Sequence, residues 1–368
     1  MDCTAEHFLS PSKSPTTVTD PLSSLIQLQS EIYGKGIRTM GVRDLLQFIA
    51  KLQQCRQHKG RVDLATRHLR VSSDCVDSTF DQPTEDLVAA YCNHVRYQVR
   101  EWFCKSSWER RGEIIPRSQL HLGTNDPEDI MFEMQMQMAV ATEHLPPNYC
   151  CAVMMTILEE LEHMQSRIKS YLVPSSESIL IERVCAIIND SACLFERFDN
   201  ICLSNDFLGG NILPSYTLKK KKDQITAQFL HLANSATGTL AQLILRDLKP
   251  VLSKLWEDDD HIQTIISTFR DYFKDLRLWI APIFFAKCIR HCLENLLQSY
   301  IDRFSTKKHI LNVNTAVEVL EKDRLNLLQF FGCEHSTEMK QAGLSKLSDV
   351  ENRLHILQVL QSTIRSRR

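Results

Sequence analysis

The sequence has little glycine and little proline, with 11 and 12 of these residues among 368. Both residue types mark the frequent turns of sheet proteins, so their scarcity favours long helices over turn-dense sheets. No segment alternates apolar and polar residues over a useful length, and we therefore expect almost no strand. The composition predicts an all-α protein.

Motifs for phosphate binding and nucleophilic catalysis are missing from the sequence. It contains no G-x-x-x-x-G-K-[ST] loop, no G-x-G-x-x-G fingerprint and no G-x-S-x-G elbow. The formal net charge of -2 provides no overall attraction to nucleic acid. We therefore expect a non-enzymatic protein without a cofactor, a metal, a small-molecule substrate or a nucleic-acid partner.

Cysteine is plentiful, with 13 residues, but no C-x-x-C pair occurs. The first twenty residues lack the apolar run of a secretory signal, and the cytosol keeps thiols reduced. Cys288, His291 and Cys292 occupy neighbouring helical positions, but no second ligand pair accompanies them, so core cysteines are favoured over zinc. No window approaches eighteen uninterrupted apolar residues, and we expect no membrane span.

The segment 261–304 is rich in helical pattern and carries no catalytic spacing. Apolar residues recur at steps of three and four on both sides of Pro282, which places each set on one helix face. Pro282 stands where the first turn of a second helix tolerates proline. The segment predicts packing, and a protein that works through shape and contact.

Similar patterns predict helices along most of the chain. Residues 1–20 are expected to form a disordered tail, and a loop at Gly209 and Gly210 is expected to divide a first bundle (21–208) from a second (209–368). A helix is expected to start at Thr84, and a linker to occupy 332–343. The other expected helices are 22–33, 42–58, 125–145, 151–171, 177–203, 218–248, 314–331 and 345–364.

Two groups of basic residues are candidates for contact with a partner or a lipid. The first is the run Lys219, Lys220, Lys221 and Lys222, which either meets anionic headgroups or is a solvated helix start. The second is a set that shares one helical face and either meets a partner or serves solubility. It consists of Arg270, Lys274 and Arg277.

One pair of residues raises a catalytic alternative. Glu160 and His163 have the E-x-x-H spacing that di-metal helical bundles use. Such a centre needs a second motif and two further carboxylates, and no convincing second copy is present. A di-metal helical oxidoreductase therefore remains the remote alternative to a scaffold.

Several helical segments occur in an order that resembles one known family, the exocyst complex component three or Sec-six tethering subunits. The pattern Thr-Phe-x-Asp-Tyr-Phe-x-Asp of the family resembles the run that starts at Thr268 and ends at Asp275. A second block resembles Val184-Cys185-Ala186-Ile187-Ile188-Asn189-Asp190. The similar segments are 44–54, 95–109, 127–141, 180–201, 266–276, 296–304 and 320–331.

This resemblance implies an elongated rod of successive helical bundles of the tethering-complex type. It also implies vesicle tethering in exocytosis by a cytoplasmic protein that is peripheral at the plasma membrane. Its partners would be other exocyst subunits and SNARE proteins, with peripheral contact to anionic membrane. Family members are about twice as long and begin with a coiled coil, so a C-terminal fragment, a short gene model and a truncated paralogue outside the exocyst remain open.

Overall fold

The computed structural model describes residues 21–65, 74–105, 114–116, 121–173, 180–255, 261–306, 313–344 and 346–366. Helices dominate these residues, which confirms the all-α prediction. The expected tail at 1–20 lies outside the described residues. The N-terminal elements are α1 (Pro21–Lys35), the 3₁₀ turn η1 (Ile37–Thr39), α2 (Val42–Ala65), α3 (Asp74–Lys105), β1 (Ile115–Pro116), β2 (Leu122–Gly123), α4 (Asp126–His144) and α5 (Pro147–Tyr171).

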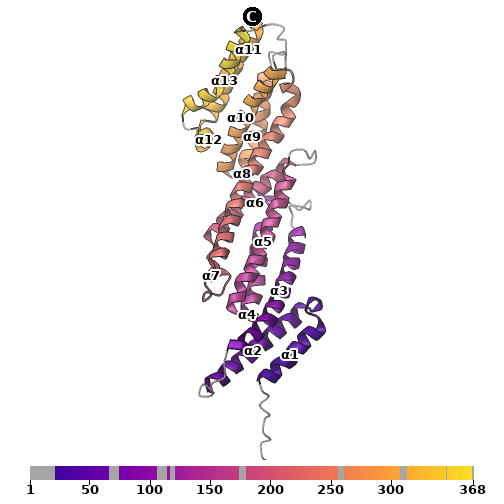
Figure 1. The fold of residues 1–368 in the computed structure, drawn as a ribbon. Coiled ribbons are helices and arrows are strands. Elements are labelled where there is room, and N and C mark those ends of the chain that lie inside the picture. The colour runs from indigo at the N-terminus through magenta and orange to yellow at the C-terminus, as the bar shows by residue number, and fades with distance from the viewer. Residues whose placement is uncertain are drawn as a thin grey trace, which may run out of the picture. The chain divides into compact units, whose positions relative to one another are not determined.

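The remaining elements continue the helical pattern to the end of the described chain (Figure 1). They include one π-helical segment, η3, between two α-helices. These elements are α6 (Ile181–Asn200), α7 (Leu203–Asp206), α8 (Tyr216–Leu252), α9 (His261–Trp279), α10 (Pro282–Thr306), α11 (Val313–Leu327), η3 (Leu328–Glu334), α12 (Ser336–Gln341) and α13 (Leu347–Ser366).

The chain forms two compact units, and the first consists of Met1–His94 and Ala141–Cys150. In this unit α1 packs against α2 through buried leucine and isoleucine side chains. The Tyr33 hydroxyl donates to Asp86 over 3.0 Å, and a ring nitrogen of His94 lies 3.0 Å from the Met40 carbonyl oxygen. These two bonds attach the start of the chain to α3.

The second unit consists of Val95–Val140 and Cys151–Arg368. Its long helix α8 packs against both α6 and α10 (Figure 1). The Ser215 side chain caps this helix by accepting a hydrogen bond from the Leu218 amide over 3.2 Å. Buried Leu218, Ile225 and Phe229 then follow the helical period, so the sequence pattern fixes which face enters the core.

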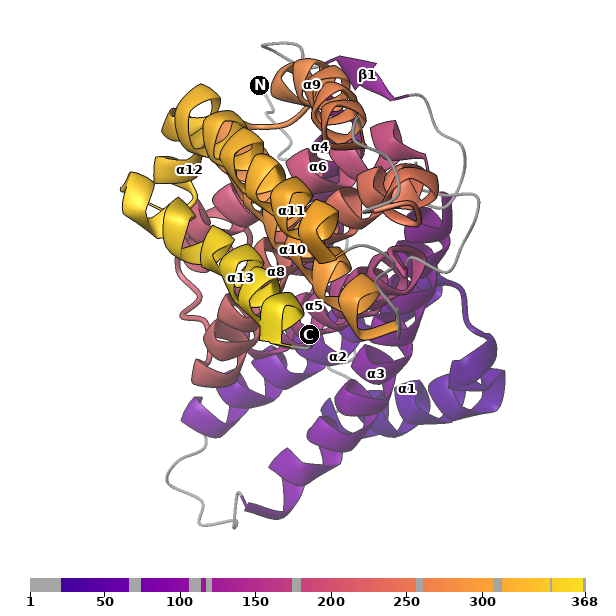
Figure 2. The same ribbon diagram turned by 90° about the horizontal axis from the view of Figure 1, so that it is seen from above.

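The C-terminal elements form a smaller layer in the second unit. α11 lies beside α13, and η3 contacts α11, α12 and α13 (Figure 2). The aromatic centre of this region joins α9 to η3, because the rings of Phe269 and Phe331 lie 5.8 Å apart and those of Phe273 and Phe330 lie 5.9 Å apart. Burial of these rings stabilises the layer.

Two local predictions were wrong. The third helix starts at Asp74 rather than Thr84 and continues through Pro83, whose fixed φ is compatible with a helix although its ring removes one backbone donor. The expected linker 332–343 is largely helical, since η3 and α12 cover most of it. Glycines at both of its ends suggested a loop, but Gly332 is part of η3 and only Gly343 has a left-handed φ of 88°.

The boundaries between the two compact units follow residues 94, 140 and 150, and none of them falls at Gly209 or Gly210. α6 precedes this loop and α8 follows it, yet the two helices pack directly against each other. The division into 21–208 and 209–368 stays a prediction about which parts fold alone.

Candidate functional site

Polar side chains buried in the second unit join segments that are distant in sequence. The Asn189 amide nitrogen donates to the carbonyl oxygens of Leu122 over 2.6 Å and Trp279 over 2.7 Å. Its oxygen accepts from the Ala281 amide over 3.1 Å. One side chain on α6 therefore satisfies backbone groups at β2 and in the turn between α9 and α10.

The neighbouring Asp190 is fully buried and holds the segment that precedes α4. Its carboxylate accepts from the Thr124 amide over 3.1 Å and from the Thr124 hydroxyl over 2.7 Å. The same hydroxyl oxygen accepts from the Asp126 amide over 3.1 Å. The carboxylate thus has partners in place of water, and its role is to position the chain.

A second buried group contains His261, Tyr300 and Asp323. One carboxylate oxygen of Asp323 lies 2.9 Å from a ring nitrogen of His261 and 2.8 Å from the Tyr300 hydroxyl, which donates to it. Burial, followed by the negative charge of Asp323, raises the pKa of Tyr300. All three residues are almost fully buried, so the group joins α9, α10 and α11 and has no open face for a substrate.

The E-x-x-H pair does not form a metal centre. The Glu160 carboxylate is buried and accepts from Arg100 over 2.7 and 2.9 Å, while Arg96 lies at 3.5 Å. His163 is exposed one turn further along α5. Because two guanidinium groups neutralise Glu160, its function is to attach α5 to α3. No cluster of metal ligands occurs within the part of the chain that the structure describes.

Cys288 and Cys292 are also structural, as expected. Both side chains are completely buried in α10. Burial, followed by the nearby Cys288, raises the pKa of the Cys292 thiol well above its ordinary value. A thiol held in its neutral form is a poor nucleophile.

The four lysines of the first candidate group separate onto two faces of α8. Lys221 donates to the Glu162 carboxylate on α5 over 2.6 Å, and this bond lowers the pKa of Glu162. Lys222 reaches the Asp199 carbonyl oxygen at 3.4 Å. These two lysines therefore attach α8 to neighbouring helices.

Lys219 and Lys220, by contrast, are exposed on the surface of α8. Neither side chain has a partner among the residues that the structure describes. Only this half of the predicted lysine run remains available to an external anion.

The second candidate group is also divided by the structure. Arg270 pairs with Glu334 over 2.7 Å and Arg277 pairs with Glu338 over 2.7 Å. Lys274 is exposed between them and has no partner in the described parts of the chain. The sequence did not reveal the two acidic partners, because both lie in the segment that was expected to be a linker.

The arginines also lie over aromatic rings. The guanidinium of Arg270 lies 5.6 Å from the Phe330 ring centre, and that of Arg277 lies 5.5 Å from the Phe285 ring centre. Cation–π contact and ion pairing together direct both guanidinium groups toward η3, α10 and α12. Lys274 is therefore the free charge of the predicted set.

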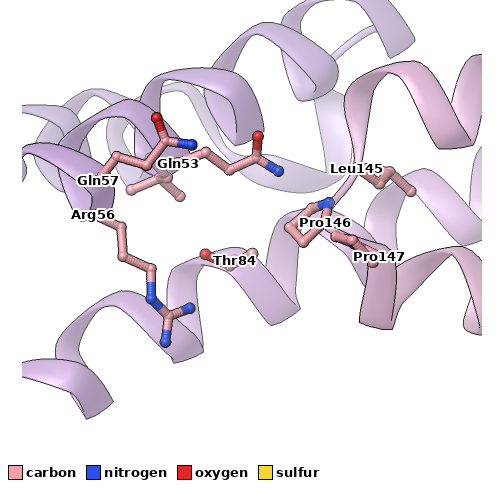
Figure 3. Close-up of a pocket in the computed structure, with 8 residues that line it drawn as sticks. Gln53, Arg56, Gln57, Thr84, Leu145, Pro146 and Pro147 are labelled. Carbon is pink, nitrogen blue, oxygen red and sulfur yellow. The ribbon is translucent and has the colours of Figure 1, made fainter. Parts of the chain in front are cut away.

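The first unit contains a shallow pocket of about 310 Å³ (Figure 3). Arg56, Gln53 and Gln57 enter it from α2, and Arg56 also pairs with Asp81 over 3.1 Å. Leu145, Pro146 and Pro147 form its other wall. Among these lining residues Thr84 supplies a hydroxyl, but none of them is a carboxylate or a histidine that could activate it, so the chemistry of the pocket suits contact rather than reaction.

No described helix combines the length and the apolar character needed to cross a membrane. The ionisable groups described above mostly hold helices to one another. The fold and these groups together define a helical scaffold protein, in which polar side chains mainly fix the packing of the helices.

The family to which this scaffold belongs is shown by comparison. Residues 60–366 match the family model of the exocyst complex component Sec6, and the chain belongs to this family. Its members are structural subunits of a tethering complex and not enzymes. This result confirms the family that the order of helical segments suggested.

Two relatives illustrate the similarity. The exocyst complex component sec6 of Schizosaccharomyces pombe is 22% identical over 182 residues, which are 46% of this chain and 23% of that protein. The crystal structure of the C-terminal domain of the exocyst subunit Sec6p has a TM-score of 0.58 and 15% identity, and the match covers 76% of this chain and 77% of that one. The similarity to the crystal structure shows a shared fold.

Proposed function

We propose that this chain is a non-catalytic subunit of an exocyst-type complex that tethers vesicles before fusion. The observation that carries the proposal is the family match, which extends over residues 60–366. The internal use of the buried polar groups supports it, because they form cross-links between helices and leave no reactive centre in the described residues. The proposed setting is the cytoplasmic face of the plasma membrane at sites of exocytosis.

The proposed partners are other exocyst subunits, SNARE proteins and, peripherally, anionic membrane. Lys274 is the candidate for contact with an acidic protein partner, because it is exposed on α9 while Arg270 and Arg277 are paired within the chain. Surface charges of this kind mainly affect association rate and specificity. Lys219 and Lys220 are the candidates for membrane contact.

Affinity purification of the tagged full chain from cells, followed by mass spectrometry, tests the proposal. We expect other exocyst subunits and SNARE proteins to co-purify. Lys274→Glu is expected to reduce recovery of one partner, whereas Lys254→Glu, a change at another exposed lysine, is expected to leave recovery unchanged. A purification that recovers none of the exocyst subunits would support the alternative, a relative of the same fold that acts outside the exocyst.

A further inference from the structure

Two apolar side chains beside the start of α8 are unusually exposed. Leu213 is 85% exposed and Tyr216 is 81% exposed, the highest fractions among the large apolar residues that the structure describes. Single exposed apolar residues are common on protein surfaces. Here two of them stand within four residues and adjoin Lys219 and Lys220, so apolar area and free positive charge occur together.

The helical period places Tyr216 and the free lysines on one face. Tyr216 is the first residue of α8, and Lys219 and Lys220 follow it at steps of three and four. The opposite face is fixed, since Leu218 is completely buried and Ser215 caps the helix. The exposed side chains are therefore presented by an anchored helix start.

A hollow of about 340 Å³ adjoins these residues and is lined in part by Leu213, Lys219 and Lys222. The acidic groups nearby already have neighbours in the chain. Asp223 lies 3.8 Å from Lys222, and Asp206 accepts from the Cys202 amide over 2.9 Å. Neither Lys219 nor Lys220 forms an ion pair with a described residue, and three lysines adjoin the one carboxylate that lines the hollow, that of Asp223, so positive charge is in excess at this surface.

We propose that Leu213, Tyr216, Lys219 and Lys220, here called the α8 corner, bind the surface of an anionic lipid bilayer. Leu213 and Tyr216 enter the interfacial region, while the lysines meet the negatively charged headgroups. The apolar side chains protrude, as insertion into a bilayer requires, whereas a folded partner would have to provide a cavity for each of them. This inference deepens the membrane contact of the proposed function and rests on it for its cellular setting.

The test is co-sedimentation of the full chain with vesicles of phosphatidylcholine alone and of phosphatidylcholine mixed with phosphatidylserine. We expect binding to the mixed vesicles only, and weaker binding as salt increases. Lys219→Ala/Lys220→Ala should lower the partition coefficient about 25-fold, because each lysine near an anionic surface contributes roughly fivefold. Leu213→Ser/Tyr216→Ser should lower it about tenfold or more through lost apolar burial.

The matched control is Lys249→Ala/Lys254→Ala, which removes two exposed lysines elsewhere and should leave binding unchanged. Absence of binding to the mixed vesicles would overturn the inference. The inference would also be overturned if the lysine changes reduced vesicle binding and the Leu213 and Tyr216 changes did not, because the protein would then adsorb to the membrane surface without inserting apolar side chains. Capture by an immobilised poly-glutamate peptide, with no vesicle binding, would overturn it in favour of an acidic peptide.

The same variants separate this inference from the proposed function. Circular dichroism should show unchanged helix content and melting, since all four side chains are exposed. If the variants lose vesicle binding and still co-purify with exocyst subunits, the α8 corner is confirmed as a distinct membrane surface. If the unaltered chain binds mixed vesicles but no exocyst subunit, the proposed function fails and the α8 corner stands.

Discussion

Asn189 illustrates how single polar residues organise this protein. Its side chain supplies both donors and its acceptor to backbone groups of Leu122, Trp279 and Ala281. Aspartate has no donor for the two carbonyl groups, and glutamine is longer by one methylene group. The geometry therefore calls for asparagine at this position.

Replacement of Asn189 by alanine is expected to lower the free energy of unfolding by about 2–4 kcal/mol, because part-buried backbone groups lose their partners. Urea denaturation followed by circular dichroism measures the change. Asn200→Ala is the control in the same helix, since the Asn200 side chain is exposed and donates to the Glu196 carbonyl oxygen one turn earlier. Equal effects of the two substitutions would contradict the role assigned to Asn189.

Protonation of the buried His335 is expected to make the stability of the second unit depend on pH. Its ring lies 5.3 Å from that of Phe273 and 4.9 Å from that of Phe330. Burial, the largest cause, lowers the pKa of His335, although nearby Glu338 acts in the opposite direction. The folded state therefore favours the neutral ring over the charged one.

The resulting stabilisation is complete above the unfolded-state pKa of about 6.5 and is lost as the pH falls from there through the lower folded-state pKa. We expect His335→Gln to show a smaller loss of unfolding free energy than the unaltered chain between about pH 6.5 and 5. Chemical denaturation at several pH values measures this slope. His355→Gln, at an exposed histidine of α13, should keep the original slope, and a variant at His335 that also kept it would refute the assignment.

At the scale of elements, η3 and α12 depend on α9 for their position. Arg270 and Arg277 pair with Glu334 and Glu338, and each guanidinium also lies over an aromatic ring. Exposed ion pairs and exposed cation–π contacts each contribute only about 0.5–1 kcal/mol. A short π-helical segment and a six-residue helix are nevertheless unstable by themselves, so these pairs act together with the buried rings of Phe330 and Phe331.

The double substitution Arg270→Gln/Arg277→Gln should therefore loosen η3 and α12 locally. We expect amide hydrogen exchange there to accelerate about tenfold, with little change in α6 or α8. Mass spectrometry of proteolytic fragments after exchange measures the effect. Lys274 lies on the same helix face and has no partner among the described residues, so Lys274→Gln should have no effect. Equal acceleration by Lys274→Gln would show that general surface charge, rather than pairing, holds these elements.

The element patterns also show which features a sequence can predict. Long amphipathic runs such as α8, α9 and α10 were found because their apolar period follows from burial on one face. The helical segment around Gly332 was missed, because glycine has low helix propensity and the contacts of η3 with α11 and α13 override it. The ion pairs of Arg270 and Arg277 could not be predicted either, because their partners Glu334 and Glu338 lie in this same segment.

At the scale of the whole molecule, the packing of α6 on α8 is the feature that bears on domain division. The intervening loop contains Gly209 and Gly210, both with φ near 74°, a left-handed conformation that suits glycine. Leu208 beside them is completely buried. The connection, which also contains α7, thus joins two helices that contact one another.

A protease site inserted between Gly209 and Gly210 should allow cleavage without separating the two pieces. We expect them to elute together in size-exclusion chromatography, because the apolar interface of α6 and α8 remains buried. The same cleavage in high urea is the control and should release both pieces. Separation in native buffer would show that 21–208 and 209–368 are independent bundles.

The candidate surfaces were predicted only in part, for a reason that applies to the whole fold. Sequence spacing correctly placed Lys219 and Lys220 with Lys221 and Lys222 at a helix start. It gave no information about Glu162 on α5, which lies far away in sequence and pairs with Lys221. Long-range packing determines which charged side chains remain unpaired, and local sequence patterns carry no information about that packing.

Asn189 has a final consequence for the order in which the chain folds. Its hydrogen bonds join residues 67 and 90 positions away, so they form only after long stretches of chain have been brought together. Closing loops of this length costs conformational entropy before the bonds can form, and we expect the bonds of Asn189 to form after the rate-limiting step of folding. Their loss would then leave the rate of folding almost unchanged and shorten the lifetime of the native state. Asn189 would then form its hydrogen bonds between helices that have already packed together.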